Sequence, residues 1–246
     1  MYNILVPRDC GARLKTREGA GNIMIQDNVR RIRERIAEAC SRSNRHPDEI
    51  VIIAVTKGRT LSDINEAIEA GITDIGENRV QEALKKYNAI RDTHYAIRVK
   101  WHMVGHLQTN KAKEAVKIFD LIHSVDSLRL AEEIDKQAHK IKKVQDILIE
   151  ANTSGEVSKF GFKAEGIIGA VKEIVQFKNI KVKGLMTIAP ALDSPEKTRP
   201  YFRMLREIKD KINSVRILSM GMTDDFEVAI EEGANMVRLG RVIFEG

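Results

Sequence analysis

The chain has 246 residues, of which 43% are hydrophobic and 31% charged, and its formal net charge is +6 at pH 7. This balance of apolar and charged residues excludes general disorder, and no run reaches the roughly 18 apolar residues of a membrane helix. The two cysteines are too few for a disulfide scaffold and fit a reducing cytoplasm. Basic and acidic residues alternate, which favours a mixed solvated surface over a nucleic-acid-binding face.

The N-terminal 23 residues show neither helical nor strand periodicity, and the apolar run Ile4–Val6 is too short for a signal peptide. We expect residues 1–23 to be a disordered extension or a cloning remnant. The residues that follow recur at helical spacing and predict an amphipathic helix from about residue 24. Its apolar face consists of Ile25, Val29, Ile32 and Ile36.

Eight short apolar runs follow, separated by amphipathic stretches. The runs are 50–56, 73–76, 98–104, 119–125, 144–152, 181–188, 215–221 and 236–240. The helical stretches include 61–70, 79–87, 128–141, 164–175, 195–212 and 224–232. Continuous apolar runs are typical of strands buried on both faces, and eight strand–helix units predict one α/β domain over residues 24–246, a (β/α)8 TIM barrel. A doubly wound open sheet is the alternative, but its usual GxGxxG turn is absent.

In such a barrel, functional residues lie at the carboxyl ends of strands. Lys57 follows the first run and Asn78 follows the second. A lysine partly desolvated near other cations becomes a usable amine nucleophile, although a lysine that merely reaches solvent is the commoner case. Asn78 either contacts a ligand or caps the helix that starts near Arg79.

The seventh and eighth runs end in residues suited to an anion. Ser219 and Met220 precede a glycine turn and a helix, whose free N–H groups and dipole favour negative charge. Gly240 and Arg241 follow the eighth run, and phosphate sites after the last two strands recur in TIM barrels; two ordinary turns are the other interpretation. Arg238 lies two residues before Gly240, so it points to the same face and needs an acceptor there.

Other signals are weaker. His102 and His106 do not share a helix face and no HExxH motif includes them, so we expect no metal site. The GxSxG and GxxxxGK[ST] motifs are absent, which argues against an α/β-hydrolase nucleophile and a Walker-type nucleotide site. Cys40 lies near the apolar side of the first helix and fits packing rather than chemistry.

Seven segments, in order from about residue 24 to the C-terminus, form a recognisable set. They are VTKGR at 55–59, GENRVQEA at 76–83, WHMVGHLQTNKAK at 101–113, HSVDS at 123–127, KVKGLMTIAP at 181–190, LSMGMTDDFEVAI at 218–230 and VRLGRVIFEG at 237–246. Together they closely resemble the pyridoxal phosphate homeostasis protein family. That family is similar to the N-terminal barrel of alanine racemase, which implies a barrel of fold type III that binds pyridoxal 5′-phosphate (PLP).

The resemblance implies that Lys57 holds PLP as a Schiff base, that Asn78 lines the ring and that Arg238 faces the pyridine nitrogen. The implied phosphate contacts, largely through backbone N–H groups, are Ser219, Met220, Gly240 and Arg241. The chain departs from the family at Arg241, where a small hydroxyl residue is common, and at Glu245, where we expect glycine.

A guanidinium cannot accept the ring proton, so the resemblance implies poor stabilisation of a carbanion. The sequence ends at Gly246, so we expect neither a second racemase domain nor its second base. We expect a cytoplasmic, monomeric protein that buffers PLP or delivers it to apo-enzymes, without robust catalysis and without nucleic-acid or membrane partners. Two alternatives stay open: a slow racemase-like enzyme with Lys57 as its sole base, and a barrel that binds another phosphorylated metabolite.

Overall fold

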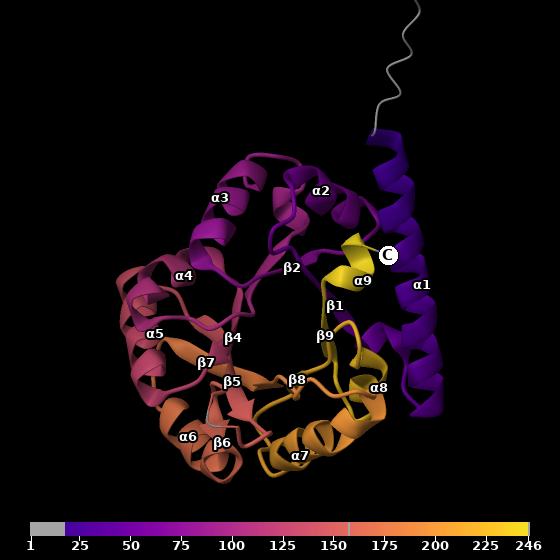
Figure 1. Ribbon diagram of the computed structural model, residues 1–246. Helices are drawn as coiled ribbons and strands as arrows, with labels where there is room; N and C mark the ends of the chain where they lie inside the picture. Colours follow the sequence, from indigo (N-terminus) through magenta and orange to yellow (C-terminus); the bar gives the residue numbers. More distant parts are fainter. Residues whose placement is uncertain (1–17, 157, 246) are drawn as a thin grey trace, which may run out of the picture.

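The computed structural model describes residues 18–156 and 158–245. In this part of the chain eight parallel strands close into a barrel, and helices surround it (Figure 1). The strands are β1 (Val51–Val55), β2 (Asp74–Glu77), β3 (Lys100–Met103), β4 (Leu121–Val125), β5 (Gln145–Asn152), β7 (Ile180–Thr187), β8 (Ile217–Ser219) and β9 (Met236–Leu239). A two-residue strand, β6 (Phe162–Lys163), pairs with the end of β5.

The strand pairing confirms the TIM barrel and shows that the open-sheet alternative is wrong. Around the ring the order is β1-β2-β3-β4-β5-β7-β8-β9, and β9 pairs with β1 again. In an open sheet two of these strands would be edges. Here the eight predicted runs supply the eight strands of the barrel, so each one has two hydrogen-bonded neighbours.

The helices follow the predicted stretches, with differences in how some stretches are divided and in two short helices. They are α1 (Glu18–Arg42), α2 (Leu61–Glu69), α3 (Val80–Ile90), α4 (Ala112–Ile118), α5 (Leu128–Lys140), α6 (Ile167–Ile174), α7 (Arg199–Asp210), α8 (Phe226–Glu231) and α9 (Arg241–Phe244). The stretch 195–212 is divided into a 3₁₀ turn and α7, because the ring of Pro200 does not fit a helix that continues from Glu196. The pattern missed α4 and α9, which are too short for a clear helical period.

Helix α1 lies outside the ring and packs against α2, α8 and α9 (Figure 1). The predicted apolar face is buried as expected. The predicted start is wrong, because the helix begins at Glu18 and includes residues 18–23. Adding a residue to an existing helix needs only one more main-chain hydrogen bond, so a helix can extend beyond its amphipathic part. The rest of the expected extension, with Cys10, lies outside the described residues.

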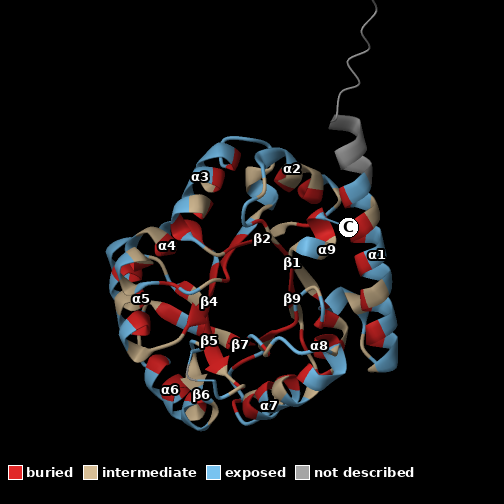
Figure 2. Ribbon diagram, in the orientation of Figure 1, coloured by how far each residue is buried: buried red, intermediate tan, exposed pale blue. Residues whose placement is uncertain are grey.

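Most of the core lies between the barrel and its helices (Figure 2). A second apolar cluster comes from strands alone and fills the inside of the barrel. It consists of Leu121, Leu148 and Met186 with Ile217 and Met236 packed against them. None of the described helices combines the length and the apolar character that crossing a membrane requires.

Candidate functional site

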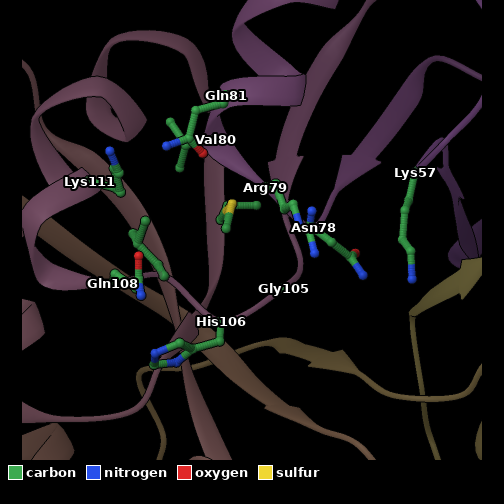
Figure 3. Close-up of a pocket in the computed structure, with 11 residues that line it drawn as sticks. Lys57, Asn78, Arg79, Val80, Gln81, Gly105, His106, Gln108 and Lys111 are labelled. Carbon is green, nitrogen blue, oxygen red and sulfur yellow. The ribbon is translucent and has the colours of Figure 1, made fainter.

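The carboxyl ends of the barrel strands lie at one end of the molecule, because every strand pairing is parallel. Lys57 and Asn78 follow the adjacent strands β1 and β2, and both line a cleft of about 470 Å³ (Figure 3). The start of α3 and the loop 105–108 after β3 form further walls. The structure thus brings two predicted site residues together.

Lys57 is exposed, and the backbone on both sides of it is held by one buried cluster. The ammonium of Lys86 donates to the Thr56 carbonyl at 2.6 Å and to the carboxylates of Glu77 and Glu82, each at 2.7 Å. The Gly58 N–H donates in turn to Glu82 at 2.7 Å. The sequence analysis missed Lys86, although its position on the buried face of the predicted helix could have identified it.

Asn78 is half-buried and does not cap the following helix. The N-cap residue of α3 is Arg79, and no side chain accepts a hydrogen bond there. Gly105 packs so closely on Asn78 that a β-carbon at Gly105 would lie 2.5 Å from the Asn78 carbonyl oxygen. The capping interpretation is therefore wrong, whereas a ligand contact from the Asn78 amide stays a prediction.

A polar layer lies inside the barrel, directly above the apolar cluster. His123, Glu150, Ser219 and Arg238 each follow a residue of that cluster, or one packed on it, by two positions, so they share its inward face. All four are buried. The sequence analysis found Ser219 and Arg238 but missed His123 and Glu150; a charged or imidazole side chain inside an otherwise apolar strand run was the available signal.

Arg238 is only 4% exposed and its guanidinium has two protein acceptors. It donates to the Ser219 hydroxyl at 2.7 Å and to the Thr187 carbonyl at 2.9 Å. Burial lowers the pKa of Arg238 to about 10, an effect that the charges of Asp225 and Glu150 oppose. A guanidinium has five N–H groups and no acceptor, so Arg238 can still donate to a ligand in the barrel mouth.

The residues after β8 and β9 differ in what they can offer to an anion. The N–H of Met220 already donates to the Met236 carbonyl at 3.1 Å, so the expected main-chain donor of Met220 is not free. Gly240 is the N-cap residue of α9, and the N–H of Arg241 lies in its first turn, where intrahelical acceptors are lacking. The guanidinium of Arg241 is largely exposed and pairs with Asp224 at 2.5 Å, so its side chain already has an acidic partner.

The unusual Glu245 has a defined partner. Its carboxylate forms an ion pair with Arg59, which lies two residues after Lys57. The guanidinium of Arg59 also lies over the ring of Phe244, 5.2 Å from its centroid. The end of the described chain therefore packs on the loop that carries Lys57.

Glu150 is a buried carboxyl group whose Oε2 has no hydrogen-bond partner in the described residues. Burial raises its pKa from the usual 4.5 to about 7, the charge of Asp126 adds to this effect, and that of Arg238 opposes it. A carboxyl group of this kind can take up or release a proton near neutral pH.

We expect the Glu150→Gln variant to be more stable than the parent protein above pH 7. Because the folded-state pKa lies above the unfolded value, the folded protein binds more protons between pH 4.5 and 7, so Glu150 costs stability progressively as the pH rises through this window. The full effect is about 3 kcal/mol at 1.36 kcal/mol per pH unit. Urea unfolding at pH 5 and pH 8 measures it, and an equal stability difference between the two proteins at both pH values would contradict it.

Comparisons with known proteins agree on one family. Residues 24–246 match the family model of the alanine racemase N-terminal domain. A pyridoxal phosphate homeostasis protein of Aquifex aeolicus is 44% identical over 223 residues, which cover 89% of this chain and 96% of that protein. Two solved structures are similar over most of the chain. An unknown protein from Bifidobacterium adolescentis has a TM-score of 0.87 and 35% identity, with 92% of this chain and 96% of that chain covered. PipY of Synechococcus elongatus, solved with PLP bound, has a TM-score of 0.74 and 33% identity, with 85% and 99% covered.

Proposed function

The chain belongs to the family of pyridoxal phosphate homeostasis proteins, which shares the barrel of the alanine racemase N-terminal domain, and from this we propose that it binds PLP in the barrel mouth and takes part in PLP homeostasis. It would buffer the group or deliver it to apo-enzymes, without robust catalysis of its own. The observation that carries the proposal is the placement, toward the carboxyl end of the barrel, of an exposed lysine on a loop anchored by hydrogen bonds and of a buried guanidinium inside the barrel.

The donor groups of the site fit the parts of PLP. Lys57 supplies a primary amine for covalent attachment to the aldehyde, and Asn78 lines the same cleft. Arg238 supplies N–H donors for an unprotonated ring nitrogen. The backbone N–H groups at Gly240 and Arg241 are the proposed phosphate contacts. Ser219 acts through Arg238, which donates a hydrogen bond to its hydroxyl, and Met220 is buried in the core cluster.

When bound, PLP supplies an aldehyde that reacts reversibly with amines and a ring that withdraws electrons best when its nitrogen is protonated. Arg238 favours the unprotonated ring, because it can only donate hydrogen bonds there. Tyr87 packs on Trp101 at the outer side of the barrel, and the hydroxyl of Tyr95 donates to Glu69. These two tyrosines are therefore engaged elsewhere and do not offer a base to the barrel mouth.

We expect the purified protein to take up one equivalent of PLP and to develop an absorption band that borohydride reduces. The same sample, given amino acids, should exchange the α-hydrogen with solvent at well below about 1 s⁻¹, a low rate for an enzyme. A protein that takes up no PLP would contradict the binding proposal. Faster exchange would instead support the slow racemase that uses Lys57 as its base.

We propose that the protein works in the cytoplasm as a monomer. The recipients of its PLP would be apo-enzymes that depend on this cofactor. The support for the cytoplasm is the small number of cysteines, which fits a reducing compartment.

A further inference from the structure

A continuous chain of hydrogen bonds runs through the inside of the barrel to Arg238. It starts at Asp74, the first residue of β2, whose side chain is 13% exposed. Asp74 Oδ1 lies 2.9 Å from Nε2 of His102, and Nδ1 of His102 lies 2.9 Å from Nε2 of His123. The Nδ1 atom of His123 lies 2.9 Å from the Ser219 hydroxyl, to which Arg238 donates at 2.7 Å.

The chemistry at each end of this chain sets its direction. Arg238 has only donors, so the Ser219 oxygen accepts from it. At the other end burial would raise the pKa of Asp74, but the hydrogen bond from His102, with further effects of Thr73 and Lys100, lowers it overall. An ionised carboxylate only accepts, so Nε2 of His102 carries a hydrogen and donates it.

The inner links follow from the neutral state of His123. Burial, with the nearby charge of Arg238 as a further cause, holds the pKa of His123 well below 6.5, so the ring carries one hydrogen. Because Nε2 of His102 holds the hydrogen that it donates to Asp74, a neutral His102 ring has only Nδ1 as an acceptor, and this atom takes Nε2–H of His123. The Nδ1 atom of His123 then accepts from the Ser219 hydroxyl. In this arrangement every hydrogen bond points the same way, from Arg238 through Ser219, His123 and His102 to Asp74.

We propose that Asp74, His102 and His123 are positioning residues for the ligand site: they turn the Ser219 hydroxyl hydrogen away from the ligand and hold the Ser219 oxygen as the acceptor that orients Arg238. This inference rests on the proposed function, because it takes Arg238 to face bound PLP. It also assigns Ser219 a role that differs from a hydroxyl contact to phosphate. The hydrogen of that hydroxyl is committed to His123.

The direction of these hydrogen bonds is tested first in the ligand-free protein. Nitrogen-15 spectra of the histidine rings should show both His102 and His123 neutral and protonated on Nε2. A His123 ring that is protonated on Nδ1 would overturn the inference, because Ser219 would then accept from both neighbours and keep its hydrogen for a ligand. This measurement does not depend on PLP binding, so it stands even if the proposed function fails.

The role in binding is tested with matched variants and the Kd for PLP. Glutamine at position 123 can accept from Ser219 through its carbonyl and donate to His102 through its amide, whereas leucine can do neither. We expect His123→Gln to stay within about threefold of the parent Kd and His123→Leu to bind about tenfold more weakly, the effect of one lost hydrogen bond to a charged group. Equal Kd values for the two variants would overturn the positioning role.

A second pair of variants, Asp74→Ala and Asp146→Ala, controls for effects on the stability of the barrel. Asp74→Ala should weaken PLP binding about tenfold. Asp146→Ala should not, because Asp146 also lies near the amino end of a barrel strand but pairs with Lys183 near the surface, at 3.5 Å. If the parent protein binds PLP and both alanine variants bind it equally well, the chain of hydrogen bonds has no positioning role. If the parent protein binds no PLP, the proposed function is what has failed.

Discussion

Replacement of Lys57 by alanine is expected to abolish the covalent attachment of PLP. Only an unprotonated primary amine can form a reducible bond to the aldehyde, and the exposed amine of Lys57 lies in the cleft with Asn78 (Figure 3). After borohydride reduction, mass spectrometry of the parent protein should find the modified peptide around Lys57. The Lys57→Ala protein should keep the noncovalent contacts of Arg238, so we expect it to retain weak binding without a reducible band.

Lys159→Ala is the matched control for this variant. Lys159 lies on the loop after β5 and pairs with Glu156 at 2.9 Å, so its loss should leave the reducible band unchanged. A reducible band that survives in Lys57→Ala, or one that disappears in Lys159→Ala, would place the anchor on another lysine. Either result would contradict the assignment of Lys57.

Replacement of Lys86 by methionine is expected to produce the largest loss of stability. The Lys86 side chain is 9% exposed, and its ammonium pairs with Oε1 of the fully buried Glu77 and with the carboxylate of Glu82. Removing one partner of a buried ion pair leaves the other charge uncompensated and costs about 3–5 kcal/mol. Burial already raises the pKa of Glu77, although Lys86 and Thr56 oppose this effect, so Glu77 should bind a proton in the variant.

The free energy of unfolding in urea measures this effect, and Lys85→Met is its control. Lys85 is the preceding residue of α3 and is exposed, so its replacement should change stability by less than about 0.5 kcal/mol. We also expect slower attachment of PLP in folded Lys86→Met, because the Thr56 carbonyl and the Gly58 N–H would no longer be held through one cluster. A Lys86→Met protein as stable as Lys85→Met would show that the ion pairs contribute little.

The order of helices and strands could be predicted from the sequence, because apolar periodicity is a local property of the chain. The eight runs became the eight barrel strands, and the apolar face of the first helix became the buried face of α1. The boundaries of the helices and strands were predicted less well. The start of α1 at Glu18 and the division before α7 depend on main-chain hydrogen bonding and on one proline ring, which side-chain hydrophobicity does not report.

The sequence by itself also determined which end of the barrel the candidate residues would occupy, because the carboxyl ends of barrel strands follow from chain direction alone. It placed Lys57 and Asn78 on neighbouring strands, and the structure puts both in one cleft. Only the tertiary structure decided what each group does. Ser219 meets His123 across 96 residues of chain, and Lys86 meets the Thr56 carbonyl across 30. Hydrogen bonds of this kind depend on closure of the barrel, so no local pattern of residues could have predicted their partners or their direction.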